Sequence, residues 1–587
     1  MGQPRFLITT ADERTWKKNE PVLFLGEWCK IYRRTEAWKD MDFKVAAPYG
    51  LEKDIKEHDR LLIQSTGLQL LKEVTVALNA FHNTNHSERY WNIVLGHWLQ
   101  RFVSVACNRY FCLEKVYREN EINGTYIFNK PEYTLATNTS VDFQWALYDN
   151  VWNHTFYARI LKFWNVEQFT SLTLNEEESV GFKIENHHLP DISLKHKILT
   201  LWSRFCEKLV RKRDALIINS YLPFSQALKL QLSLFQFPGF WSHYPVSYYP
   251  VNKSARKQFT LKVEKLTGFD RFVRELLPEA MPTCYLEGYK DLVQKSEQLP
   301  WPFEPKFIFT SNNFDTDEQF KIWAAEKVVK GAKYHIGQHG NLYGTWRYHS
   351  SDIPEFATPD SFITWGWTND DPKVKPAFIF RTMDKMPMKQ ITGEKLLLIE
   401  RCIYNRLATY DRYVNHGIYQ EEQFRFVNAL NNNVQQELHV RLSMHKLGNL
   451  QWSDEQRWKD YNPELQLDKG STPLWNLIDK SKLVVHSYDS TGLLETLSLN
   501  IPTMAFWYEL YDEIVEEAQP YYKMLEEAGI IASTPEIAAE RINAHWDDMG
   551  AWWYSDKVQQ ARKRFCDKYA RHVDNPIQTL KTILTGG

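Results

Sequence analysis

Short apolar runs alternate with amphipathic stretches along residues 306–507, and this alternation limits the possible folds more than any other feature of the chain. Apolar runs bounded by turn residues are typical of buried strands, and the stretches between them have helical periodicity. Strands that alternate with helices predict a parallel sheet, so we expect an α/β protein with doubly wound, Rossmann-like domains. The expected strands are 306–310, 334–337, 362–365, 395–400, 438–444, 483–486 and 503–507.

The chain has 587 residues, which is too long for one hydrophobic core, so we expect more than one domain. Three prolines in LPWPFEP, residues 299–305, stop any helix and predict a connector. We expect an amino-terminal α/β domain with helical insertions at 1–300 and a second, doubly wound α/β domain at 306–510. Helices at 511–587 are expected to pack back on the amino-terminal domain. In the first domain, strands are expected at 6–10, 22–26, 44–49 and 214–219, and helices at 59–117 and 193–213.

Composition excludes several classes of function. The net charge is −2, so the chain has no global positive field to gather nucleic acid. The seven cysteines are scattered and form no CxxC pair, which argues against a zinc ribbon or redox motif and favours a reducing cytosol. The sequence shows no signal peptide and no apolar run long enough to span a bilayer. We therefore expect a cytoplasmic protein, and a peripheral contact with the inner face of the membrane stays open.

The segment 482–507 carries the sharpest functional signal. A buried strand ends at His486, a polar loop from Ser487 to Gly492 follows, and a helix then begins. Hydroxyls and unsatisfied N–H groups at a helix amino terminus form an anion site, and ligands of parallel sheets bind at the carboxyl ends of strands. Ser490 and Thr491 are expected to contact a phosphate there, or only to cap the helix. Glu495, on the same helix, is expected to meet a ribose hydroxyl or to be a solvated acid.

Two further loops follow predicted strands. His445 and Lys446 stand at the end of the strand 438–444, where they can neutralise a departing phosphate, unless they are solvated loop residues. In GQHGNLYG, the glycines allow a ligand to approach the backbone closely, which places Gln338, His339 and Gly340 at a candidate site. The alternative for this loop is a tight turn with a structural histidine.

A carboxylate follows the strand 22–26. Glu27 at this strand end is a candidate general base for an acceptor hydroxyl, and Trp28 can stack on a sugar, although a lone acid is often a cap or an ion-pair partner. Two DxD triplets, 40–42 and 315–317, could hold a metal in principle. The first precedes a strand and the second is explained by helix capping, so we expect neither metal nor cofactor.

These segments together carry a resemblance. GQHG, then a strand followed by His-Lys, then VVHSYDSTGLLETLSLNIPTMAFW, resemble the carboxyl-terminal half of GT-B glycosyltransferases. The pattern is most similar to transferases that use CMP-activated 3-deoxy-ulosonic acids, such as Kdo and nonulosonate transferases. LFLGEWC and ERYWNIVLGHWL look like transferases of O-antigen and other surface-polysaccharide gene clusters. Kdo-type enzymes usually have proline where this chain has Lys446.

The resemblance implies two Rossmann-like domains that face a cleft, a nucleotide sugar bound to the second and a glycan or lipid-linked glycan acceptor on the first. Ser487, Ser490, Thr491 and Gly492 would hold the donor phosphate, and Glu495 the ribose. His445 and Lys446 would assist phosphate departure. The acceptor hydroxyl would lose its proton to Glu27 or His339, and Arg401 or Arg406 would pair with a donor carboxylate. The alternatives are a UDP- or GDP-sugar transferase or epimerase, and a glycan-binding protein without activity.

Overall fold

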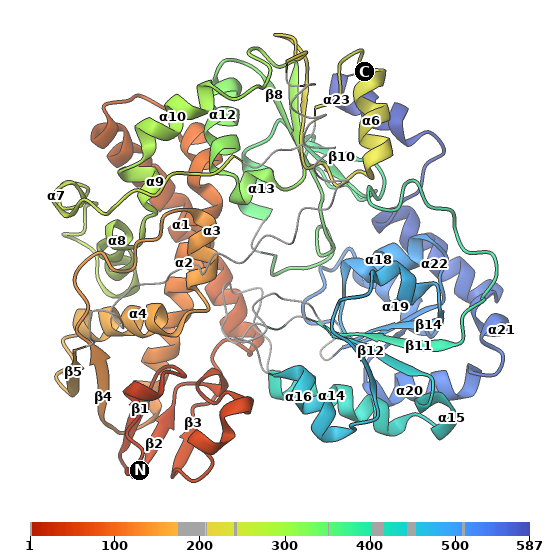
Figure 1. Ribbon diagram of the computed structural model, residues 1–587, viewed down its shortest axis with the longest axis horizontal. Helices are drawn as coiled ribbons and strands as arrows, with labels where there is room; N and C mark the ends of the chain where they lie inside the picture. The colour runs from red at the N-terminus through yellow and green to blue at the C-terminus, as the bar shows by residue number, and fades with distance from the viewer. Residues whose placement is uncertain are drawn as a thin grey trace.

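The computed structural model describes residues 3–173, 206, 208–239, 244–349, 352–401, 403, 416–442, 453–507 and 511–586. Across these residues the strands form three sheets, and neighbouring strands within each sheet are parallel (Figure 1). We name them the amino-terminal, middle and carboxyl-terminal sheets. The predicted α/β class with parallel sheets is confirmed.

The amino-terminal sheet has the strand order β3-β2-β1-β4-β5, which reverses direction at β1. β1 and β4 are neighbours in the sheet although β2 and β3 lie between them in the chain, as in a doubly wound sheet. Its strands are β1 (Arg5–Ile8), β2 (Val22–Phe24), β3 (Phe43–Val45), β4 (Ile122–Phe128) and β5 (Phe169–Leu172). Its helices are η1 (Glu13–Thr15), η2 (Glu27–Cys29), η3 (Tyr32–Ala37), α1 (Lys53–His82), α2 (Glu88–Glu119), α3 (Ser140–Ala146) and α4 (Asn150–Phe163).

Helix α2 joins the amino-terminal and middle sheets. Ser87 caps it by accepting a hydrogen bond from the N–H of Tyr90 at 3.2 Å. Trp91 and Trp98 are fully buried, and buried residues occur on all faces of the helix. A helix that is buried all round lies inside the protein, and α2 packs between α1 and α12 (Glu318–Val329). One hydrophobic core consequently extends through both bodies.

The middle sheet has the order β10-β9-β8-β7-β6, so its strands follow one another in space as they do in the chain. The strands are β6 (Leu216–Ile217), β7 (Phe307–Thr310), β8 (Lys333–Gly337), β9 (Ser361–Thr364) and β10 (Val374–Pro376). The other helices of this region are α6 (Phe224–Ser233), α7 (Lys253–Arg256), α8 (Gly268–Ala280), α9 (Thr283–Leu286), α10 (Tyr289–Glu297), α11 (Asn313–Thr316) and α13 (Asp352–Ala357).

The carboxyl-terminal sheet has the order β13-β12-β11-β14-β15-β16, with its switch point between β11 and β14. Leu396 and Leu398 of β11 face one core, and Leu397 and Ile399 face another, so both faces of the sheet are covered. The strands are β11 (Lys395–Ile399), β12 (Leu438–Arg441), β13 (Gln466–Asp468), β14 (Ser481–His486), β15 (Thr503–Phe506) and β16 (Ile531–Ala532). The helices are α14 (His416–Ala429), α15 (Asn432–Gln435), α16 (Asp454–Tyr461), α17 (Leu474–Ile478), α18 (Thr491–Ser498), α19 (Gln519–Glu527), α20 (Pro535–His545), α21 (Met549–Trp553), α22 (Asp556–Tyr569) and α23 (Pro576–Thr585).

The structure divides the strands of 306–510 differently from the sequence prediction. β7, β8 and β9 belong to the middle sheet, and the strands from β11 onward belong to the carboxyl-terminal sheet. The proline-rich segment 299–305 leads into β7, which pairs with β6, so it is not a boundary between sheets. A proline indicates where a helix must end, but it does not indicate which strands pair. The change of sheet falls in the segment between β10 and β11.

The last helices of the chain extend from the carboxyl-terminal sheet to the middle sheet. α20 packs on β15 and β16, whereas α23 packs on α6 and β7 of the middle sheet. The crossing is fixed by backbone hydrogen bonds, since the N–H of Arg571 donates to the carbonyl of Trp365 at 2.8 Å. The carboxyl terminus thus lies beside the middle sheet (Figure 1). None of the helices described here combines the length and apolar character needed to cross a membrane.

Candidate functional site

The carboxyl ends of the middle and carboxyl-terminal sheets meet. The loop after β8 contacts the loop after β14, because the N–H of Asn341 donates to the Oγ1 of Thr491 at 3.0 Å. Gly340 lies so close to this hydroxyl that a Cβ on it would be 3.3 Å away. Ligands of parallel sheets bind at this edge, so the contact places both predicted loops at one site.

Asp489 is the centre of this contact. Its buried carboxylate accepts hydrogen bonds from the Nδ2 of Asn341 at 2.5 Å and the Nε1 of Trp346 at 2.7 Å. The hydroxyl of Tyr522, from α19, donates to it at 2.6 Å. Burial raises the pKa of Asp489, and these three donated hydrogen bonds oppose that rise. Asp489 therefore fixes the loop after β14 against residues from two other elements.

The hydroxyls at the start of α18 are engaged within the protein. Ser490 caps the helix by accepting from the N–H of Leu493 at 2.9 Å, and it contacts the Nδ1 of His486 at 3.0 Å. Burial lowers the pKa of His486 to about 3, so its ring is neutral. A Cβ on Gly492 would be 2.8 Å from this ring, so glycine is needed there. The backbone N–H groups of Thr491 and Gly492 donate to no described acceptor, and they remain the anion-binding groups of the helix terminus.

The switch point between β11 and β14 is closed by a chain of hydrogen bonds. The N–H of Arg401 donates to the hydroxyl oxygen of Tyr419 at 2.6 Å, and this hydroxyl lies 2.7 Å from the Oγ of Ser487. Ser487 in turn donates to the carbonyl of Ile399 at 3.2 Å. The predicted residues Arg401 and Ser487 therefore lie together. Glu400 is buried beside them, and burial together with the Asp454 charge raises its pKa.

Glu495 faces the linker between the middle and carboxyl-terminal sheets. Its Oε1 lies 2.7 Å from the Nε of Arg381, whose guanidinium also lies 5.8 Å from the ring centroid of Tyr221. The Glu495 side chain is 9% exposed and that of Arg381 46% exposed, so the arginine is the accessible partner. Burial raises the pKa of Glu495, and the Arg381 charge opposes the rise.

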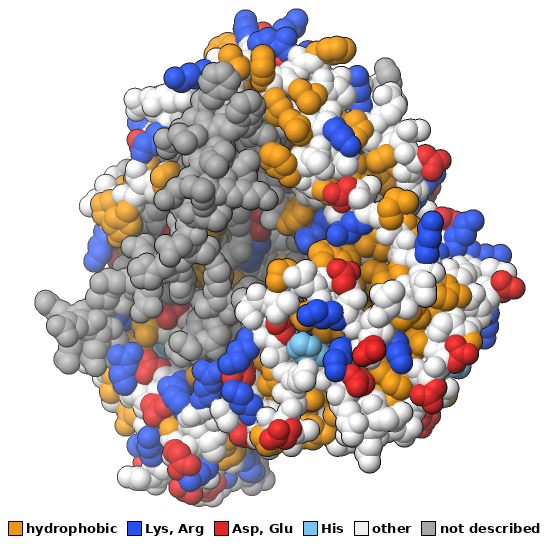
Figure 2. Space-filling view, turned by 45° about the vertical axis from the view of Figure 1, so that its right-hand side comes forward, with side chains coloured by type: hydrophobic (Ala, Val, Ile, Leu, Met, Phe, Trp, Pro, Cys, Tyr) orange, Lys and Arg blue, Asp and Glu red, His pale blue; other side chains and the backbone are white. Residues whose placement is uncertain are grey.

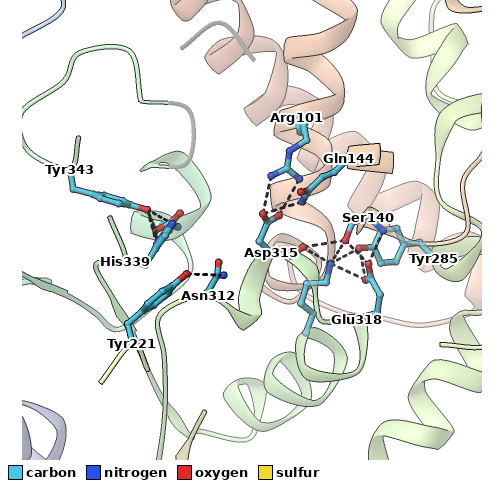
Figure 3. A network of polar contacts seen from close by, with 12 residues as sticks. Arg101, Ser140, Gln144, Tyr221, Tyr285, Asn312, Asp315, Glu318, His339 and Tyr343 are labelled. Carbon is cyan, nitrogen blue, oxygen red and sulfur yellow. Dashed lines mark hydrogen bonds and ion pairs between the residues drawn. The ribbon is translucent and has the colours of Figure 1, made fainter. Parts of the chain in front are cut away.

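His339 lies between two tyrosines at the end of β8 (Figure 3). Its ring is stacked with Tyr221, and the hydroxyl of Tyr343 lies 3.0 Å from its Nδ1. Tyr343 donates to the Oε2 of the buried Glu355 at 2.7 Å. Burial and the nearby His349 lower the pKa of His339 to about 4, so the ring is neutral near pH 7. A neutral, 26% exposed imidazole can accept a proton.

The side chain of Gln338 holds the same turn. Its Oε1 accepts from the N–H of Trp365 and from the Nε1 of Trp367, both at 2.9 Å. Its Nε2 donates to the carbonyl of Gly340 at 2.8 Å. Gln338 is 1% exposed, so its position fits a role in shaping the loop.

Glu27 lies at the carboxyl end of β2, as predicted, and its charged neighbour is Lys30, three residues along the chain. Its side chain is 51% exposed and lies 3.2 Å from the Nζ of Lys30. The following helix η3 contacts α16, because the hydroxyl of Tyr32 donates to Asp460 at 2.7 Å and Arg457 lies over the Tyr32 ring. The amino-terminal sheet therefore also directs its carboxyl edge toward the carboxyl-terminal body.

The second DxD triplet stabilises the contact between bodies. Asp315 accepts two hydrogen bonds from Arg101 of α2, at 3.1 and 3.0 Å, and a third from Gln144 of α3 (Figure 3). Burial alone would raise the pKa of Asp315, but the Arg101 guanidinium holds it well below the usual range. Asp317 caps α12 by accepting from the N–H of Phe320 at 3.0 Å, as expected. Within the described ranges, no group of three or more His, Cys, Asp or Glu side chains could hold a metal ion.

Three predicted residues, His445, Lys446 and Arg406, lie outside the described residues, as does most of the predicted helix 193–213. The described members of the site lie in the loops after β6, β8, β11 and β14, on α18 and in the linker, and they gather where the carboxyl edges of two parallel sheets meet.

A family model for LIC12162 family transferases matches residues 5–584. The chain belongs to the LIC12162 family of transferases. No curated protein matches this transferase. Among solved structures, it is similar to MurG of Acinetobacter baumannii, with 10% identity, a TM-score of 0.32, and coverage of 64% of this chain and 100% of the other. It is also similar to the wall teichoic acid polymerase TagF, with 10% identity, a TM-score of 0.31, and coverage of 67% and 95%. These likenesses are too low to bear on the activity.

Sequence patterns did not indicate several residues that this transferase brings to the site. Tyr221 and Arg381 belong to segments without a motif, and only the fold brings them beside His339 and Glu495. Tyr221 has a φ of 60°, in the left-handed region, which is uncommon for a large side chain. Glu400 could have been found, because it is the first polar residue after the apolar strand β11.

Proposed function

We propose that the chain transfers a sugar from a nucleotide-activated donor to a glycan or lipid-linked glycan acceptor. The donor proposed is a CMP-activated 3-deoxy-ulosonic acid of the Kdo or nonulosonate type, and the acceptor a surface polysaccharide such as O-antigen. Membership of a transferase family supports group transfer. The single observation that carries the proposal is the meeting of two parallel sheets at their carboxyl edges, through Asn341 and Thr491.

In this proposal the donor nucleotide binds at the switch point of the carboxyl-terminal sheet. The N–H groups of Thr491 and Gly492 bind the phosphate, which replaces the expected role of the Ser490 and Ser487 hydroxyls, because those hydroxyls have partners within the protein. The backbone of Arg401 lies at the same edge, and its guanidinium is the proposed partner of the donor carboxylate. Glu495, on α18, binds a ribose hydroxyl of the donor.

The chemical step needs a base, and His339 is well placed for it. An acceptor oxygen attacks the anomeric carbon, the bond from this carbon to the phosphate oxygen breaks, and the acceptor proton moves to the imidazole. The lowered pKa keeps the His339 ring unprotonated near pH 7 but also weakens it as a base, so its pKa has to rise when the charged donor phosphate binds nearby. Arg381 and the helix terminus of α18 stabilise charge on the leaving phosphate. Glu27, which stands at the edge of the amino-terminal sheet, is the second candidate base.

The test is thermal stability of the full chain in a panel of CMP, UMP, UDP and GDP. A ligand that binds only the folded state raises its stability by about 2.7 kcal/mol at a hundredfold excess over Kd. We expect stabilisation by CMP, and its loss in Glu495→Gln and Arg401→Ala. Arg425→Ala is the matched control, because Arg425 pairs with Glu536 on the exposed face of α14.

Stabilisation by UDP or GDP in place of CMP would overturn the donor assignment and favour the UDP- or GDP-sugar alternative. If none of the four nucleotides raises the stability, sugar transfer from a nucleotide donor is excluded, and the glycan-binding alternative gains support.

A further inference from the structure

The amino edge of the middle sheet presents large apolar side chains to solvent. We define the amino-edge patch as Leu232, Phe235, Phe237 and Phe303 together with Arg211, Lys212, Arg213 and Lys306. Phe235 is 84% exposed, Phe303 66%, Leu232 54% and Phe237 52%. Figure 2 shows apolar and basic side chains together at the top of the molecule, where Figure 1 places α6. Exposed apolar groups of this size mark an interaction surface.

Phe235 occupies a position that glycine usually fills. It follows α6 with a φ of 59°, and the N–H of Gln236 donates to the carbonyl of Gln231 at 3.3 Å, which is the pattern of a Schellman cap. A bulky residue in this left-handed conformation is strained, and its ring gains almost no burial in return. Stability of the cap therefore does not explain this phenylalanine, whereas contact with an apolar partner does.

Basic residues connect the exposed rings. The guanidinium of Arg211 donates to the carbonyl of Phe235, and the Nζ of Lys212 lies 5.7 Å from the ring centroid of Phe303. The Nζ of Lys581, on α23, lies 5.8 Å from the Phe235 ring. Since Arg211 and Lys212 are adjacent in the chain, these contacts place the Phe235 and Phe303 rings on one surface.

The patch has an excess of positive charge. Asp214 pairs with Arg211 at 3.0 Å and Glu304 pairs with Lys212 at 2.8 Å. Arg213 and Lys306 are exposed; neither is within ion-pair distance of a carboxylate in the described part of the chain, and the Arg213 charge acts on Glu304 from farther away. Aromatic rings flanked by unpaired cations fit a surface that is apolar beneath and negatively charged above, which is the chemistry of an anionic bilayer.

We propose that the amino-edge patch docks the protein on the surface of an anionic phospholipid bilayer. The phenylalanine rings insert at the level of the headgroups, and Arg213 and Lys306 bind lipid phosphates. The patch lies at the amino ends of β6 and β7, so it is at the opposite edge of the sheet from the candidate site. The bound protein therefore keeps that site clear of the lipid, and the inference does not depend on the proposed function.

The test is sedimentation of the full chain with vesicles of phosphatidylcholine, with and without phosphatidylglycerol. We expect binding to the anionic vesicles only, weakened by added salt. Phe235→Gly should lower the partition coefficient about tenfold, because one inserted ring is lost. It should leave Tm unchanged or raise it, because glycine suits the cap. Arg213→Gln with Lys306→Gln should lower partitioning about thirtyfold, because each cation contributes about 1 kcal/mol near an anionic surface.

Met386→Ser is the control, since Met386 is 81% exposed but lies in the linker between the middle and carboxyl-terminal sheets. The proposal is overturned if the wild type does not sediment with anionic vesicles, or if Phe235→Gly and Met386→Ser bind equally. It is also overturned if sedimentation velocity shows a dimer that Phe235→Gly dissociates, because the patch would then be an interface between two copies.

Discussion

Replacing Asp489 by alanine tests the contact that places the candidate site. The change removes a buried carboxylate and leaves three donors, on Asn341, Trp346 and Tyr522, without their acceptor. A buried donor without a partner costs about 1–3 kcal/mol. Allowing for relaxation and for water entering the gap, we expect a loss of about 3–6 kcal/mol in the free energy of unfolding.

Asparagine at this position gives an intermediate result. Asp489→Asn keeps one oxygen as an acceptor but turns an NH₂ group toward at least one donor. We expect a loss of about 1–3 kcal/mol, because part of the network survives. Asp547→Ala is the matched control, since Asp547 is exposed, and its loss should stay below about 0.5 kcal/mol.

The assay is urea-induced unfolding followed by tryptophan fluorescence, with the slope of the transition compared between variants. A change of midpoint with an unchanged slope reports stability alone. A loss of less than about 1 kcal/mol in Asp489→Ala would refute the role of Asp489 as the centre of the contact. The same result would remove the reason for placing the loops after β8 and β14 at one site.

Three further predictions concern buried groups. Gly492→Ala should cost about 1–3 kcal/mol, because its Cβ would be 2.8 Å from the ring of His486, whereas Gly550→Ala, with no atom nearer than 3.9 Å, should be neutral in the same unfolding assay. Burial raises the pKa of Glu422 to about 7, so the wild type loses stability as pH rises from about 4.5 to 7. The stability of Glu422→Gln relative to wild type should therefore increase by about 2 kcal/mol between pH 4.5 and pH 8. The same Tm difference between the two proteins at pH 4.5 and at pH 8 would contradict this. Burial lowers the pKa of His82 to about 4, so the contribution of neutral His82 to the free energy of unfolding is lost as pH falls from about 6.5 to 4. The difference in free energy of unfolding between wild type and His82→Gln should decrease by about 2–3 kcal/mol across that range. A constant difference would be evidence against this prediction.

The sequence predicted the local elements better than their partners. The strand ending at His486 and the helix capped by Ser490 were both expected, because an apolar run and a capping residue are local signals. The strands of 306–365 were expected in one domain with those that follow, whereas they pair with β6 and β10 in the middle sheet; parallel pairing depends on contacts between distant segments. β6 illustrates this limit, because a strand was expected at 214–219, but its pairing with β7 across the expected domain boundary was not.

The same limit applies to the candidate site. The polar loop at 487–492 was found from its composition, but composition could not show that its hydroxyls bond to His486, Tyr419 and Asn341. Tyr221, which stacks on His339, and Arg381, which pairs with Glu495, come from segments more than a hundred residues away. Only the packing of the two sheets brings these side chains together.

Hydrogen exchange of the full chain with and without CMP tests the central claim most directly, because it shows where a nucleotide binds. The account predicts slower exchange in peptides that cover 395–401 and 487–495, which form the switch point of the carboxyl-terminal sheet and the start of α18. Unchanged exchange throughout the chain, or protection confined to the amino-terminal sheet, would contradict it.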